Sequence, residues 1–392
     1  MSDAPLWKIP LSDLDYGPEE AAAVQRVVAG KWLSMGPEVQ AFEGEFAAMQ
    51  GAAHALAVSN ATAGLHLALL ALGIGPGDEV IQPALNFVAA ANMTVAAGAT
   101  PVFGDIVSLS EPTLDPAEAE RLITPRTKAI VVMHYGGDFC RMAEFADLCR
   151  RRGIALIEDA CHAVGAAYHD PQGRPPHGIV AGSMGDIGVF SFFANKNLST
   201  GEGGMVVTQR DDLAQRLRLL RSHGMTSLTW DRHKGHAQSY EVVLNGYNYR
   251  LDELHAALGR AQLAKLERNN RRRRALRALY FQRLRPLAME GWTLPFDGAP
   301  GEPSGYLLVA VAPDPEARAR AAQALREARI QSSLHYPCVS DFEAFRRWRS
   351  EEVPRTRRFC AGILTLPLFS TMTEEMVETV SATVIEAAAS TA

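Results

Sequence analysis

Residues 187–208 read IGVFSFFANKNLSTGEGGMVVT, and this stretch decides how the rest of the chain is expected to fold. The apolar runs at its two ends, residues 187–192 and 204–208, are rich in the β-branched and aromatic residues of strands. The segment between them contains Ser199, Thr200 and two glycines, with a third glycine, Gly204, directly after it, a composition that is typical of a turn. The stretch therefore predicts two neighbouring strands joined by a loop that carries one lysine, Lys196.

Upstream of this pair, short apolar runs alternate with helical patterns. The predicted strands cover residues 54–58, 79–82, 101–103, 129–133 and 154–158. The helices predicted around and between them cover residues 18–29, 38–49, 63–72, 86–97, 116–123 and 142–152. Strands that come singly between helices are typical of a mostly parallel sheet with helices on both faces, so the fold class is α/β.

Downstream of the pair, the pattern changes to two helices at residues 211–220 and 251–285, the second a long connector. The segment YLLVAVAP, a helix over 314–328 and a closing helix from Thr373 to about Ala389 predict a smaller α+β unit. A chain of 392 residues exceeds the size of one ordinary core. We therefore expect a large domain over residues 1–250 and a small domain over residues 251–392.

Composition excludes several classes of protein. The net charge of -5 and a pI of about 6.1 argue against a nucleic-acid partner, and the run Arg271–Arg274 is interpreted as a solvated helix face. The five cysteines are scattered without a CxxC pair, which argues against a disulfide framework and a zinc site. The chain shows no signal-peptide pattern at its start and no apolar run long enough to span a bilayer. We expect a soluble, cytoplasmic enzyme.

Two residues at strand ends are candidates for chemistry. Asp159 follows the apolar strand in IEDACH, although one acid there is also typical of a helix cap. Lys196 lies in a loop of small and aromatic residues, although a single lysine is also typical of an exposed turn. Together they match the needs of a carbonyl cofactor, because a lysine forms its imine and an acid keeps its pyridine nitrogen protonated.

A third candidate site is the strand-to-helix junction Ser59-Asn60-Ala61-Thr62-Ala63-Gly64. Free N–H groups and the helix dipole at such a junction favour an anion such as a phosphate, although Ser, Asn and Thr are also ordinary helix caps. The GxGxxG pattern is absent, which argues against a nicotinamide dehydrogenase.

Two pairs of residues allow more than one interpretation. His233 and His236 are spaced like metal ligands, but no third ligand accompanies them, so a loop over the active site is preferred and no metal is predicted. His335-Tyr336 is expected either to face the cleft or to pack in the core of the small domain.

With these motifs in view, the chain resembles the fold-type I pyridoxal 5'-phosphate (PLP) aminotransferases of the DegT/StrS family. The resemblance runs from KWLSMGPEVQAFE to LTLPLF, and it is carried by SNATAGLHLAL, NFVAAANMTVAAGATPVFGDI, ITPRTKAIVV, IEDACHA, FSFFANKNLSTGEGGMVVT and GYNYRLDELHAALG. It implies an aspartate-aminotransferase-like large domain with a seven-stranded sheet.

The resemblance also implies a role for each matching residue. Lys196 matches the lysine that forms the Schiff base with PLP, and Asp159 matches the acid at the pyridine nitrogen. The other implied contacts are the aromatic that stacks on the ring, a residue near the phenolic oxygen, three phosphate-binding positions, and a phosphate contact from the neighbouring subunit of a homodimer: Phe87, His162, Thr62, Ala63, Ser191 and Asn248.

The chain departs from the usual family pattern in several places. Ala61 replaces a glycine, and Ala194-Asn195 replaces a His-Pro pair before the lysine. Leu85-Asn86 and Tyr135-Gly136-Gly137 replace Thr-rich and Tyr-Gly-Gln versions. These positions lie near the expected substrate, so they concern the substrate more than the cofactor.

The implied function is ping-pong transamination of a keto sugar in antibiotic or polysaccharide biosynthesis. The sugar would be nucleotide-linked, and the amino donor would be L-glutamate. The sequence leaves open a cyclitol or another natural-product ketone as the acceptor. A non-catalytic PLP-binding regulator is less favoured because no DNA-binding module accompanies it. A sugar dehydratase of the family would carry histidine at the position of Lys196.

Overall fold

A seven-stranded sheet forms the centre of the computed structural model, which describes residues 7–168, 179–227, 230, 233–235, 239–348 and 352–389. The strand order is β1-β9-β8-β5-β4-β2-β3, and only β9 runs antiparallel to its neighbours. The strands are β1 (His54–Val58), β2 (Glu79–Pro83), β3 (Thr100–Gly104), β4 (Thr127–Met133), β5 (Ala155–Asp159), β8 (Ile187–Ser191) and β9 (Gly204–Thr208). The predicted α/β class and mostly parallel sheet are confirmed.

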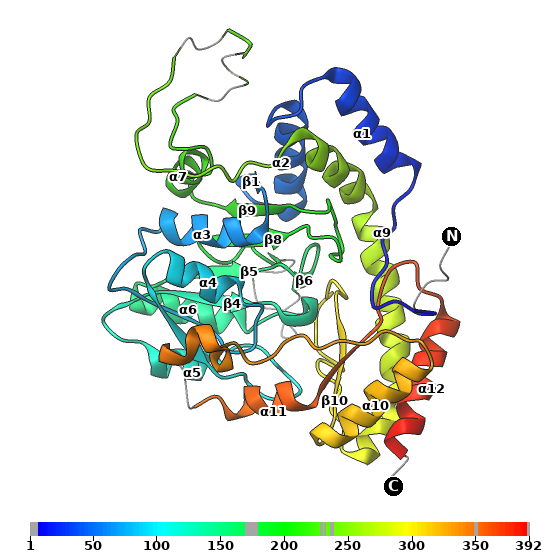
Figure 1. Ribbon diagram of the computed structural model, residues 1–392. Coiled ribbons are helices and arrows are strands. Elements are labelled where there is room, and N and C mark those ends of the chain that lie inside the picture. The colour runs from blue at the N-terminus through cyan, green and yellow to red at the C-terminus, as the bar shows by residue number, and fades with distance from the viewer. Residues whose placement is uncertain are drawn as a thin grey trace.

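Helices cover both faces of this sheet (Figure 1). They are α1 (Pro18–Gly30), α2 (Pro37–Gln50), α3 (Ala61–Ala71), α4 (Ala89–Ala96), α5 (Pro116–Leu122), α6 (Met142–Arg152) and α7 (Asp211–Arg221). Alternate residues of β4 face opposite layers, because Ala129 and Val131 pack in the core under α3 and α7, whereas Ile130 and Val132 pack against α5 and α6. This explains why the central strands are apolar at nearly every position.

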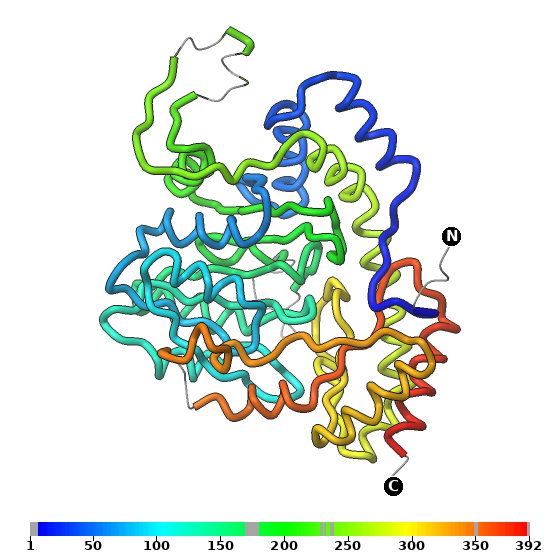
Figure 2. The backbone as a smooth tube through the Cα atoms, in the orientation of Figure 1, coloured from blue at the N-terminus to red at the C-terminus, as the bar shows by residue number. Residues whose placement is uncertain are grey.

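The C-terminal part has a core of its own. Its elements are α9 (Glu253–Leu284), η2 (Arg285–Glu290), β10 (Leu308–Val311), α10 (Pro315–Glu327), η3 (Val339–Asp341), η4 (Glu343–Trp348), α11 (Pro354–Gly362), β11 (Ile363–Leu366) and α12 (Glu374–Ala389). Figure 2 shows α9 running from the main body to lie beside α12, and these two helices share a buried cluster with β10, β11 and α10. The N-terminal segment joins this cluster through Ile9, which pairs with Ile330. The division at residue 250 stays a prediction.

Three short elements complete the described chain: η1 (Tyr135–Gly137), β6 (Ala167–Tyr168) and β7 (Ile179–Val180).

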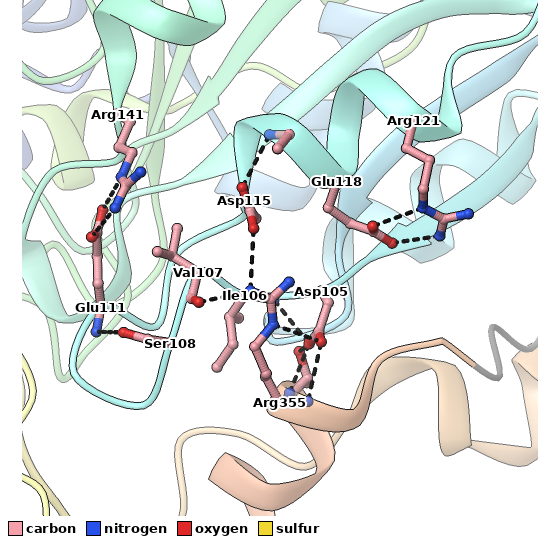
Figure 3. A network of polar contacts seen from close by, with 12 residues as sticks. Asp105, Ile106, Val107, Ser108, Glu111, Asp115, Glu118, Arg121, Arg141 and Arg355 are labelled. Atoms are coloured by element: carbon pink, nitrogen blue, oxygen red, sulfur yellow. Dashed lines mark hydrogen bonds and ion pairs between the residues drawn. The ribbon is translucent and has the colours of Figure 1, made fainter.

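The end of β3 is connected to the C-terminal part by one buried carboxylate. Asp105 accepts hydrogen bonds from the backbone and hydroxyl of Thr356, both at 2.7 Å, and from the backbone and Nε of Arg355, both at 3.1 Å. Arg355 also reaches Asp115 and the carbonyl of Val107 (Figure 3). Asp105 therefore caps the start of α11 from another part of the chain.

We expect Asp105→Ala to lower the free energy of unfolding by about 3 kcal/mol, because it leaves the fully buried Thr356 without its acceptor. Urea unfolding measures this change. Glu118→Ala is the matched control, since Glu118 pairs with the half-exposed Arg121 in the same region (Figure 3) and should cost less than about 1 kcal/mol. Equal losses in the free energy of unfolding for the two variants would contradict the assignment of Asp105 as the cap of α11.

Candidate active site

A cavity of about 290 Å³ lies at the edge of the sheet where the parallel strands end. It takes residues from the loops after β1, β2, β5 and β8 and from the C-terminal part. Its walls are formed by Asn60, Ala61, Thr62, Leu65, Asn86, Phe87, Ala89, Met133, Asp159, Cys161, His162, Ser191, Phe193, Asn195, Lys196, Glu202, Tyr306, His335 and Tyr336.

Most of the residues singled out from the sequence meet in this cavity. Ala63 and Asn248 are not among its lining residues. Those that line it are Thr62, Phe87, Asp159, His162, Ser191 and Lys196.

Asp159 is the last residue of β5 and is 5% exposed. Its Oδ1 accepts the N–H of Cys161 at 3.2 Å, which fixes the direction of the carboxyl group. The backbone carbonyl of Asp159 accepts the N–H of His134 at 3.2 Å. The carboxylate is therefore held at the floor of the cavity by the strand end itself.

Lys196 lies in the loop between β8 and β9. Although it is far from Asp159 in sequence, it lies at the same edge of the sheet and lines the same cavity. Its Nζ lies 4.2 Å from the centre of the Tyr306 ring, a distance that allows a cation–π contact. The Tyr306 hydroxyl donates to Oδ1 of the adjacent Asn195 at 3.2 Å. The C-terminal part therefore supports the lysine loop from one side.

The start of α3 lies close against the sheet. Asn60 caps the helix by accepting the N–H of Ala63 at 2.9 Å. A Cβ at Gly204 would lie 2.8 Å from the backbone nitrogen of Ala61, so only glycine permits this approach. The N–H groups of Ala61 and Thr62 have no acceptor within the helix and belong to the cavity wall. The N–H of Ala63 is already used by the cap.

His162 is almost completely buried and lies between two tyrosines. Its Nδ1 accepts the N–H of Gly136 at 3.3 Å, so Nε2 carries the hydrogen and faces the Tyr336 hydroxyl at 2.8 Å. Its ring centre lies 4.4 Å from that of Tyr306. Burial, and then the charge of Lys196, hold the pKa of His162 well below its usual range. His162 is therefore a neutral imidazole with a defined tautomer.

Phe87 presents its ring to the cavity and is 55% exposed. An exposed aromatic ring at a cavity wall offers a flat apolar face to a ligand ring. The nearest described aromatic partner is Tyr336, with ring centres 5.8 Å apart. Ser191, at the end of β8, accepts the N–H of Phe193 through Oγ at 3.3 Å.

Asn248 lies in the segment between α7 and α9, where it pairs with Ser222 outside the cavity of its own chain. Its predicted contact with a phosphate in a neighbouring subunit therefore stays a prediction.

Several cavity residues were not expected from the sequence. Tyr306 precedes β10 in an apolar run that carries no signal for a site. It reaches Lys196 because Ser304 and Leu307 donate backbone hydrogen bonds to Gly137 and Gly136 across the chain. His335 and Tyr336 both line the cavity, and Tyr336 also packs against a buried core cluster, so each of the two interpretations holds in part.

His335 predicts a pH dependence of stability. Its Nδ1 lies 3.1 Å from the Thr365 hydroxyl, and burial followed by the charge of Lys196 lowers its pKa to about 4. A histidine whose pKa is lower in the folded state stabilises the fold above the unfolded value, and this stability is lost as the pH falls from about 6.5 towards about 4.

Between about pH 7.5 and about pH 5, we expect this residue to account for a loss of about 2 kcal/mol in the free energy of unfolding. His335→Gln should remove that share of the pH dependence in urea unfolding. An unchanged slope in the variant would show that His335 does not titrate in this way.

A comparison with models of known protein families matches residues 15–385 to the DegT/DnrJ/EryC1/StrS aminotransferase family. The chain belongs to this family. It is an aminotransferase, and PLP is its cofactor.

Relatives of this family member match along nearly their whole length. The chain is 38% identical to the spore coat polysaccharide biosynthesis protein SpsC of Bacillus subtilis (strain 168), over 95% of this chain and 94% of that protein. It is similar to the structure of DesV from S. venezuelae, with 35% identity, a TM-score of 0.86, and 96% and 95% of the two chains covered. It is also similar to the PLP form of Spr1654 from Streptococcus pneumoniae, with 25% identity, a TM-score of 0.87, and 97% and 98% covered.

The cavity of this aminotransferase fits PLP chemically. A phosphate needs N–H donors such as those at the start of α3, and an aldehyde needs an amine such as Lys196. A pyridinium needs an anion such as Asp159, and its ring needs a flat apolar face such as Phe87.

Within the described ranges, no cluster of three or more His, Cys, Asp or Glu residues has the arrangement of a metal site. The His233 ring stacks on Trp230 with centres 5.6 Å apart, and His236 lies outside the described residues. In the same ranges, no helix has both the length and the apolar character needed to cross a bilayer.

Proposed function

We propose that this aminotransferase moves an amino group from an amino acid, L-glutamate, to a keto sugar linked to a nucleotide. The observation that carries the proposal is the meeting of Lys196 and Asp159 in one cavity with the exposed ring of Phe87. The name of SpsC, a relative in polysaccharide biosynthesis, supports the sugar class.

Besides Lys196, six residues that line this cavity are proposed to contact the cofactor. Thr62, at the start of α3, and Ser191, after β8, bind its phosphate. Phe87 covers one face of its ring, and Asp159 holds a proton on the ring nitrogen. The Nε2–H of His162 points to the side of the cavity where Tyr336 lies, and together these two groups are proposed to face the phenolic oxygen.

Ala63 is proposed to act on the phosphate only through the helix dipole, since its N–H is bonded to Asn60.

Lys196 is proposed to move the proton. When bound, PLP supplies an electron sink for the pair left on the substrate carbon as its proton departs. The free amine of Lys196 takes that proton from the α-carbon of the amino acid as a general base. The Lys196 ammonium would then pass this proton to the C4′ carbon of the cofactor, and in the second half-reaction the amine would take it back from there and deliver it to the carbon of the ketone that receives nitrogen. The ring of Tyr306 stabilises this cationic form and keeps Nζ at the cavity wall.

The substrate class can be tested with the pyridoxamine phosphate form of the enzyme. A panel of nucleotide-linked keto sugars, free keto sugars, cyclitol ketones and 2-oxo acids is added, and return of the visible absorbance of the lysine-linked cofactor is followed. The proposal predicts the fastest return with a nucleotide-linked keto sugar. A preference for a cyclitol ketone would contradict it.

The active site is proposed to be shared between two subunits, with Asn248 of the partner subunit binding the phosphate. The stretch just before Asn248 exposes the apolar side chains of Tyr240, Val242, Val243 and Tyr247. Exposed apolar groups in one segment are typical of a subunit interface.

Mixing two inactive variants tests this sharing. Unfolding and refolding Lys196→Ala together with Asn248→Ala yields mixed dimers in which one site has both residues intact. Since about half the dimers are mixed, we expect about a quarter of the wild-type activity to return. Without sharing, every site keeps one substitution, and no activity would return.

A further inference from the structure

Asn86 is a buried amide at the cavity wall that the proposed chemistry does not use. It follows β2 at the edge of the sheet where the other site residues lie, and it is 3% exposed. Its Oδ1 accepts the N–H of Phe87 at 2.7 Å. Because a backbone N–H can only donate, the atom facing it is the oxygen, and the orientation of the amide is defined.

The amide nitrogen of Asn86 is left without a partner. Nδ2 is buried and has no hydrogen-bond acceptor among the described residues. A buried donor without an acceptor costs about 1–3 kcal/mol, so a fold tolerates it where a ligand completes the bond. The ligand atom must be an acceptor, because Nδ2 offers only hydrogens.

The surroundings of Asn86 indicate which ligand accepts a hydrogen bond from its Nδ2. The residues just before it pair with the C-terminal part, since Ala84 accepts the N–H of Val339 at 2.9 Å and Leu85 bridges to Cys338. This places Asn86 at the seam between the wall that carries Phe87 and the wall that carries Tyr336. In the proposed function, on which this inference rests, each polar group of the cofactor already has a partner in this chain.

The charge of the cavity wall also supports a substrate oxygen as the partner of Asn86. Among the described lining residues, Lys196 is the one lysine, and no arginine contributes to the wall. A substrate oxygen in this cavity therefore meets neutral donors. We propose that Asn86 donates a hydrogen bond from Nδ2 to an oxygen of the ketone substrate and so helps to select that substrate.

Asn86→Asp and Asn86→Leu test this inference. The aspartate keeps the size and the acceptor for Phe87 but replaces the NH₂ group by an oxygen, and the leucine removes both polar atoms. Gln82→Met is the matched control, because Gln82 lies on β2 shortly before Asn86, is also buried, has an unpartnered Nε2 and does not line the cavity.

Two affinities are measured for each variant. The first is the affinity for PLP, read from the visible absorbance of the bound cofactor. The second is the affinity for a ketone, read from the concentration dependence of the return of that absorbance in the pyridoxamine phosphate form. The ketone is one that the wild-type enzyme accepts, and the 2-oxo acid of the amino donor serves if no sugar does.

We expect both Asn86 variants to bind the ketone about 10–100-fold more weakly while PLP affinity changes by less than about threefold. Gln82→Met should match the wild type in both. Unchanged ketone affinity would overturn the inference. An equal loss of PLP affinity would also overturn it, since Asn86 would then serve the cofactor. Failure of every keto sugar with the wild-type enzyme would instead count against the proposed function.

Discussion

Lys196→Ala is expected to abolish the visible absorbance of the lysine-linked cofactor and to slow transamination by at least about 10³-fold. The variant lacks the amine that bonds to PLP and the base that moves the substrate proton. Both roles belong to one side chain because Lys196 is the lysine that lines the described cavity. Absorbance spectra of purified variant with added PLP, and single-turnover rates with glutamate, measure the two losses separately.

The matched control is Lys128→Ala, which removes an exposed lysine at the start of β4. It should keep the wild-type spectrum and rate. If Lys196→Ala kept the visible band, another lysine would be the attachment point, and the assignment would be wrong.

Asp159→Asn is expected to slow the donor half-reaction by about 10²–10³-fold while the protein still binds PLP. Asparagine has the same size and keeps an oxygen for the N–H of Cys161, so the floor of the cavity should be preserved. What it lacks is the negative charge that keeps a proton on the ring nitrogen. Stopped-flow measurement of the decay of the visible band with glutamate gives the rate.

Asp147→Asn, on the exposed side of α6, is the control for a lost carboxylate and should leave the rate unchanged. A wild-type rate in Asp159→Asn would mean that the charge of Asp159 does not serve the reaction.

The central sheet could be predicted because buried parallel strands are apolar at nearly every position. The predicted strands at 54–58 and 204–208 coincide with β1 and β9, and the long helix predicted over 251–285 is α9. It could also be predicted that Asp159 and Lys196 lie at the same edge of the sheet, because parallel strands end at one edge.

The walls contributed by the C-terminal part were not predictable in the same way. Tyr306 meets Lys196 through backbone hydrogen bonds between segments about 170 residues apart, which no local pattern encodes. The hydrogen bond from the N–H of Ala63 to Asn60, in contrast, could be predicted, because Asn60 is an ordinary helix-capping residue. This bond removes one N–H group from the expected phosphate site. The first turn of helix α11 is capped by Asp105, which lies 249 residues upstream of Pro354. Sequence periodicity did not reveal this helix.

The cavity therefore depends on both cores. The strand ends supply Asp159 and the lysine loop, and the C-terminal part supplies Tyr306, His335 and Tyr336. A substitution that loosens the contact between the two parts, such as Asp105→Ala, should weaken the walls of the site as well as the fold.

The attachment point of the cofactor tests the central claim most directly. Borohydride reduction of the PLP-loaded enzyme makes the bond between cofactor and lysine permanent, and peptide mass spectrometry then finds the modified residue. The chain contains six lysines, and the account predicts modification of Lys196 alone. Modification of any other lysine in the wild-type enzyme would contradict it.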